Sequence, residues 1–340
     1  MPHTRRCARD RVVARWPTSP WRWLLLLVLV ACAMAPSGCL GMSIIPCAQL
    51  VSSRPTSAMN AMLNVSKASE LDRSAGGDGV VKLTNCTIST PTALLFVATS
   101  PARAEEIALV RVEFDSLTVV DPEGSVQLIT DQGSTATTVP PASDEDRFIQ
   151  GVHLVLRDAF VNRSVQYAGG SSSFMSWTDV NTVANVSWSI LDSVIDIRSV
   201  ANDDASAFCL APRGSLTAAN SSSRPSAVNV SWQLLRSRVR VSHTSLGSAC
   251  ALGSDEGPSK LESLAFVSEQ STVATSSTWR SAVTLGIASL SKPCHVVGVQ
   301  GTAIDSVLDA ESARGSVSVL GIASLLGSSM RDVQLKASVN

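Results

Sequence analysis

One phrase occurs twice in this chain, 44 residues apart. The segment NVSWSILDSVIDI begins at Asn185, and NVSWQLLRSRVRV begins at Asn229. A second phrase, LGIASL, occurs within Ser281–Leu290 and again within Ser316–Leu325, 35 residues further on. Self-similarity at such periods is typical of solenoids, in which each repeat is one supersecondary unit that stacks on the next.

Each unit carries the same order of short apolar runs. In the clearest unit these runs are Val230–Leu235, Val239–Val241 and Ala249–Leu252, with a Ser-centred turn after the first and a polar loop after the second. The segments VIDI and RVRV alternate apolar and polar residues with period two, which indicates strands and not helices. Successive units start roughly 28 to 44 residues apart, and the variation in length lies in the polar loops.

Three strands per unit predict an all-β protein, a right-handed parallel β-helix of about seven turns over residues 80–340. Weaker units start near Gly151, Ile107 and Val80. Ser193 and Ser237 occupy matching corners of two units, where a hydroxyl can satisfy a backbone group that turns away from the ladder.

Composition agrees with strands and limits the partners. Charged residues are 16% of the chain and aromatic residues 4%, with Ser and Thr in their place. The net charge is −1, and without residues 1–39, which hold six Arg and one Asp, it becomes −6 (21 basic, 27 acidic). A mildly acidic chain with five Lys is a poor candidate for binding nucleic acid or anionic membrane surfaces.

The first 39 residues predict a leader. A basic stretch precedes the apolar run Trp23–Ala35, whose 13 residues are short of the ~20 that span a bilayer as a helix. Small residues follow, so we predict a secretory signal peptide cleaved near Cys39 or Gly41, with an uncleaved signal-anchor as the alternative. We therefore expect a secreted or cell-surface protein.

Residues 40–79 form a different region, a lead-in to the repeats. Met59, Met62 and Leu63 have helical spacing, which predicts a short amphipathic helical cap over the first turn. The alternative is an irregular glycosylated lead-in.

Sequons support secretion. The pattern Asn-x-Ser/Thr includes six of the ten Asn residues and predicts glycosylation at Asn64, Asn85, Asn162, Asn185, Asn220 and Asn229. For Asn185 and Asn229, which are equivalent in the repeat, the alternative is an internal polar ladder that would exclude glycans.

Two further pairs occupy equivalent places in consecutive units. Cys209 and Cys250 lie in strands expected to stack about 4.8 Å apart, which suits a disulfide; two buried thiols are the alternative. Trp188 and Trp232 are expected to stack, either on an outer face as a sugar-contacting aromatic strip or as cover for loops or core.

The sequence offers little support for catalysis. A lyase or hydrolase of acidic polysaccharides needs clustered carboxylates with a basic partner, and neither GHG nor RIK occurs. Asp192 and Asp196 indicate a solvated acidic face, with a calcium site as the alternative. We predict no enzyme activity, no catalytic residue, no metal site and no cofactor.

The leader, the Ser/Ala/Val-rich turns and the recurrent phrase NVSW…L-x-S-x-V-x-V resemble the large β-helical surface proteins of kinetoplastid protists, of the dispersed gene family type, with their pectin-lyase-like repeats. The resemblance covers most of residues 80–340. It implies a cell-surface glycoprotein with membrane spans near its C-terminus. No such span occurs here, and the chain ends at RDVQLKASVN, so we expect a truncated copy or fragment, attached to the membrane by an uncleaved leader or by a missing C-terminal segment.

The sequence thus predicts a non-enzymatic surface glycoprotein that serves as a coat, in adhesion or in glycan contact. Its expected partners are glycans and host or other cell-surface proteins. The alternatives are a polysaccharide lyase or glycoside hydrolase on the same fold, and a degenerate gene copy without function.

Overall fold

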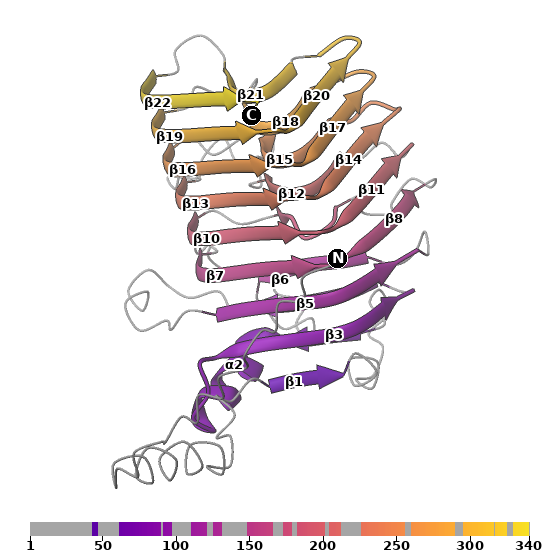
Figure 1. Cartoon of the computed structure of the whole chain (residues 1–340), viewed down its shortest axis with the longest axis vertical. Helices are drawn as coiled ribbons and strands as arrows, with labels where there is room; N and C mark the ends of the chain where they lie inside the picture. The colour runs from indigo at the N-terminus through magenta and orange to yellow at the C-terminus, as the bar shows by residue number, and fades with distance from the viewer. Residues whose placement is uncertain are drawn as a thin grey trace, which may run out of the picture. The chain divides into compact units, whose positions relative to one another are not determined.

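The computed structural model of the chain is a parallel β-solenoid (Figure 1). Most of the described residues lie in strands, and the one helix among them is short. The predicted all-β parallel β-helix is confirmed. The structure describes residues 43–46, 61–89, 91–96, 110–120, 125–130, 148–165, 173–178, 182–200, 204–211, 226–255, 260–289, 295–315, 317–324 and 329–339.

The strands stack in three columns, and each strand pairs in parallel with its equivalent in the next turn. The long-strand column contains β3 (Val80–Ile88), β5 (Val110–Val119), β7 (Phe148–Arg157), β10 (Thr182–Leu191), β13 (Ser226–Leu235), β16 (Lys260–Glu269), β19 (His295–Ile304) and β22 (Ser329–Ser338), and β1 (Ser43–Pro46) pairs with β3.

The short-strand column contains β8 (Phe160–Val165), β11 (Val194–Ser199), β14 (Arg238–His243), β17 (Thr272–Ser277) and β20 (Val307–Ser312). The third column contains β2 (Ala61–Asn64), β4 (Pro91–Phe96), β6 (Ser125–Thr130), β9 (Trp177–Thr178), β12 (Ala205–Ala211), β15 (Ala249–Asp255), β18 (Ala282–Ser289) and β21 (Val317–Ser324). Figure 1 shows the long and short strands leaving a shared corner in two directions.

About five turns in the described part have three separate strands, from β7–β9 to β19–β21, fewer than the seven expected. The two N-terminal units differ because β3 and β5 run through the corner without a break. The first residues of β5 pair with β7 and its last two with β8. After the corner residues Asn85 and Ser116, the chain stays in the ladder, since Cys86 pairs with Leu117.

One left-handed residue makes each corner between a long and a short strand. The φ angles of these residues lie between 47° and 50°, a region that costs most non-glycine residues energy. They are Asp158, Asp192, Arg236, Gln270 and Asp305. Asp is among the residues that tolerate this conformation best, and it stands at three of the five corners.

A serine ladder follows these corner residues. The N–H of Ser193 donates to Oγ of Ser237 at 3.1 Å, the N–H of Ser237 to Oγ of Ser271 at 3.0 Å, and the chain of contacts continues from Ser271 to Ser306 at 3.2 Å. Ser237 Oγ also donates to the carbonyl oxygen of Leu235 at 2.8 Å. Each hydroxyl thus satisfies backbone groups that leave the ladder at the corner, as predicted for Ser193 and Ser237.

The repeated LGIASL phrase follows from the register of the third column. Leu285 pairs with Leu320 and Gly286 with Gly321, and Leu252 and Gly253 occupy the same positions one turn earlier. Gly253 has φ +125°, and a Cβ atom there would lie 1.7 Å from the carbonyl oxygen of Gly286. Glycine is required at this position because the backbones of successive turns approach too closely for a side chain.

The helix of the lead-in region, α2 (Val65–Ser74), begins later than the sequence predicted. Met62 and Leu63 lie in β2, which pairs with β4, and not in a helix. The side chain of Asn64 caps α2 by accepting the N–H of Lys67 at 2.9 Å. Val65 and Ala68 pack the helix against the apolar core, so a short helical cap is present but displaced.

The predicted leader, residues 1–39, lies outside the described residues and remains a prediction. In the part of the chain that the structure describes, no helix has the length and apolar character needed to cross a membrane.

We predict that Ser237→Ala lowers the free energy of unfolding by about 1–3 kcal/mol, because it leaves the buried N–H of Ser193 without its acceptor. Urea denaturation followed by circular dichroism measures the change. Ser242→Ala, on the outer side of β14, is the matched control and is expected to have little effect. An equal loss in both variants would contradict the role of the ladder.

Candidate functional site

A polar groove of about 380 Å³ lies on the outer side of the long-strand column, over β7, β10 and β13. We call it the long-strand groove. It is lined by Gln150, Gly151, His153, Asn185, Val186, Ser187, Asn229 and Ser231. These residues come from three successive turns, so the groove exists only after the turns have stacked.

A column of left-handed residues shapes this groove. Gly151, Asn185 and Asn229 have φ angles of 68°, 52° and 53°, and each is skipped in the pairing between neighbouring strands. These residues interrupt the ladder at the same position on neighbouring strands. Gly151 lacks a side chain beside the two Asn residues, which leaves space at that end of the column.

The two Asn side chains form a ladder rung on the surface. Asn229 Nδ2 donates to Asn185 Oδ1 at 2.6 Å, and both residues are exposed. The alternative of an internal ladder is therefore wrong in its location, because both Asn residues lie on the exposed surface. Glycosylation at these two positions remains a prediction.

His153 and Ser187 form a second polar row beside the amides. They are register partners on β7 and β10, and Nδ1 of His153 contacts Oγ of Ser187. Burial, together with the positive charge of the neighbouring Arg111, lowers the pKa of His153 below its usual value. Arg111 pairs with Glu113 at 2.7 Å. The imidazole is therefore neutral near pH 7 and able to exchange hydrogen bonds with a neutral ligand.

The groove thus combines hydroxyl, amide and imidazole groups that both donate and accept hydrogen bonds. Such groups match the hydroxyls of a sugar. Sequence reasoning missed this set, although the signal was present: His153 stands 34 residues before Ser187, at the same place in the aligned units.

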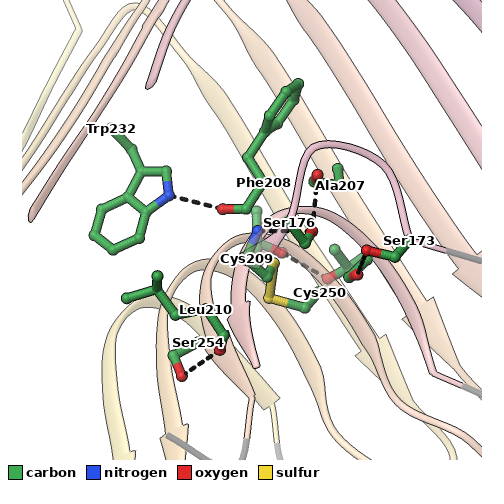
Figure 2. The surroundings of a disulfide bond; sticks show 12 residues. Ser173, Ser176, Ala207, Phe208, Cys209, Leu210, Trp232, Cys250 and Ser254 are labelled. Carbon is green, nitrogen blue, oxygen red and sulfur yellow. Dashed lines mark hydrogen bonds between the residues drawn. A yellow bond between two sulfur atoms is a disulfide. The ribbon is translucent and has the colours of Figure 1, made fainter. Parts of the chain in front are cut away.

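Trp188 and Trp232 lie inside the solenoid, which corrects the expectation of a sugar-contacting strip on an outer face. They are at most 1% exposed, and their rings stack at 5.4 Å between centroids, with Phe266 following at 4.7 Å. The indole N–H of Trp232 donates to the carbonyl oxygen of Phe208 at 2.7 Å (Figure 2), and that of Trp188 to Met175 at 3.0 Å. Because both rings are buried and their indole N–H groups are satisfied internally, they belong to the core.

Cys209 and Cys250 are joined by a disulfide between β12 and β15, with 6.4 Å between their Cα atoms (Figure 2). They are not direct register partners, since Cys250 pairs with Ser206 and Cys209 with Gly253. The bond forms a small buried cluster with Val283, apart from the main core. It therefore ties two successive turns together at the side of the third column.

The predicted sequons fall in different surroundings. Asn85 and Asn162 are exposed, as are the two Asn residues of the groove, whereas Asn64 is half-buried as the cap of α2. Asn220 lies outside the described residues. The structure leaves glycosylation of all six as a prediction.

The carboxylates that the sequence singled out pair with arginines. Asp192 is held by Arg236 of the next turn at 2.7 Å, a contact that lowers the pKa of Asp192, and Asp196 is held by Arg198 at 2.8 Å. Among the described residues, no group of three or more His, Cys, Asp or Glu side chains is placed to hold a metal ion.

Comparisons with protein-family models, with curated proteins and with solved structures found no match.

We predict that Trp188→Ala lowers the free energy of unfolding by about 3–5 kcal/mol, because it opens a cavity in the aromatic stack. Trp279, which is 41% exposed and covered on one face by Arg314, is the control, and Trp279→Ala is expected to cost less than about 1 kcal/mol. Chemical denaturation of both variants makes the comparison. A mild effect at Trp188 would contradict its placement in the core.

We also predict that His153 titrates below its ordinary pKa of about 6.5 and that Arg111→Gln raises this pKa, since one of its two causes is removed. NMR of the imidazole over a pH series measures it, with Arg157→Gln as the control. Because the folded-state pKa is lowered, the stabilising contribution is present above pH ~6.5 and is lost as the pH falls below it. An unchanged pKa in Arg111→Gln would show that burial alone is responsible.

Proposed function

We propose that this chain is a non-enzymatic, secreted or cell-surface glycoprotein that contacts glycans through the outer side of its long-strand column. The observation that carries the proposal is the long-strand groove, in which His153, Ser187, Ser231 and two amides offer neutral donors and acceptors. Sugars present many hydroxyls and little charge, so such a lining suits them better than it suits a strongly charged ligand.

Two further features support an extracellular location. Exposed sequons outside the long-strand groove, at Asn85 and Asn162, are compatible with a glycan-covered surface, whereas Asn185 and Asn229 act in the groove as free amides. A disulfide such as Cys209–Cys250 persists in oxidising compartments. Attachment to a membrane, by an uncleaved leader or by a segment beyond this sequence, belongs to the same proposal, as does the likeness to kinetoplastid surface proteins.

The stacked architecture also suits adhesion. A solenoid repeats its outer side chains in rows at the spacing of the strands, about 4.8 Å, so an extended ligand meets similar groups on successive turns. Each contact is weak, and affinity arises from many contacts along the row.

The experiment is binding of the secreted protein to immobilised neutral and acidic oligosaccharides, with product analysis for cleavage. We predict that Ser231→Tyr, which fills the groove, weakens binding at least about tenfold, a change of about 1.4 kcal/mol. Ala265→Tyr is the matched control, because Ala265 pairs with Ser231 one turn further on and does not line the groove. Cleavage of any glycan, or equal loss in both variants, would overturn the proposal.

A further inference from the structure

A second face of the solenoid carries charge in bands. On the outer side of the short-strand column, β14 presents Arg238 and Arg240, β17 presents Thr272, Ala274 and Ser276, and β20 presents Asp309 and Glu311. These side chains line a groove of about 260 Å³, which we call the short-strand groove. A cationic strand and an anionic strand thus flank a strand of small residues.

The four charged residues of the short-strand groove differ from the charged residues next to them. Arg198 is bound to Asp196 on the same strand, β11, and Arg236 is bound to Asp192 of the preceding turn. In contrast, no ion pair within the described part of the chain involves the four charged residues of the short-strand groove. The cationic and anionic strands lie two strand spacings apart, about 9.6 Å, on either side of β17.

The register makes this face complementary to itself. Arg240 pairs with Ala274, and Ala274 pairs with Asp309, so these residues stand at the same height along their strands. A two-fold axis lying in the plane of the face and along β17 exchanges β14 with β20. Arg240 of one copy then faces Asp309 of the other, and the same contact occurs a second time by symmetry, as in any isologous interface.

The uncharged side chains fit the same arrangement. At the axis, Thr272, Ala274 and Ser276 would meet their own copies, and their small size permits two sheets to approach. Arg238 would lie opposite Val307, which is 62% exposed, so that its aliphatic stem covers an apolar side chain while its guanidinium reaches an acidic neighbour.

We propose that the outer side of the short-strand column is the interface of a two-fold symmetric dimer of this chain. With the axis along β17, the two copies overlap over β14, β17 and β20, which offer three outward positions each, fewer than the ~20–30 residues a side of a standard interface. The dimer is therefore weak and depends on concentration and salt, which suits association between neighbouring molecules at a crowded surface. It does not depend on glycan binding by the long-strand groove.

Sedimentation equilibrium of the full secreted chain over a range of concentrations tests this proposal. We predict a monomer–dimer equilibrium that shifts toward monomer at high salt. Arg240→Glu and Asp309→Arg each place like charges opposite one another and raise the dimer dissociation constant by about 100-fold or more. The double variant, Arg240→Glu with Asp309→Arg, exchanges the charges and is expected to dimerise within about threefold of the original chain.

Rescue by the charge exchange distinguishes loss of the interface from a folding defect. A single variant that misfolds would also lose dimerisation, but a second substitution would not restore dimerisation to a misfolded protein. Arg157→Glu, which changes the same charge on β7, is the control and is expected to leave the dissociation constant unchanged. A monomeric chain at all concentrations, a double variant that stays monomeric, or a monomer that uses Arg238 and Arg240 to hold an acidic polysaccharide would each overturn the proposal.

Discussion

The structure depends on one constraint: every turn must reach the same corner with the same register. Parallel pairing between turns supplies the backbone hydrogen bonds of all three columns, and each long strand must then end in a left-handed residue followed by a group that satisfies the interrupted ladder. Ser193, Ser237 and Ser271 provide that group by accepting one backbone N–H and donating to a carbonyl oxygen two residues back. A buried amide without a partner costs more than a typical hydrogen bond contributes, so the corner serine is structural.

Register also decides which side chains become core and which become surface. One stack inside the solenoid runs from Trp188 through Trp232 to Phe266, and it ends where Gly301 leaves room for Leu335 and Leu320. On the outer side, the same stacking places His153 against Ser187 and Asn185 against Asn229. The long-strand groove and the short-strand groove both arise from this pairing, because it aligns equivalent outer side chains in each column.

The sequence predictions were correct for strands and corners, which depend on local periodicity and turn residues. They were wrong for features that depend on packing between distant segments. The strands and corners of the unit around Trp232 were legible because alternation and the corner Ser recur. The orientation of Trp188 and Trp232 was not, because a period of two separates two faces without saying which one is inside. The helix begins later than predicted because Met62 and Leu63 pair in parallel with β4. The first two units keep continuous strands because Cys86 and Leu117 remain paired after the corner.

The sequence by itself determined the solenoid, because the repeated phrases form equivalent strands. In successive turns of the third column, Leu pairs with Leu and Gly pairs with Gly. The sequence also determined the polar corners, because hydroxyl groups recur where the chain must leave the ladder. Only the tertiary structure decided that the amides and His153 share one groove, and that Arg238 and Arg240 stand two strands from Asp309 and Glu311. Those neighbours lie 32 or more residues apart in the chain, and loops of unequal length separate them. Their adjacency therefore arises from the stacking of whole turns.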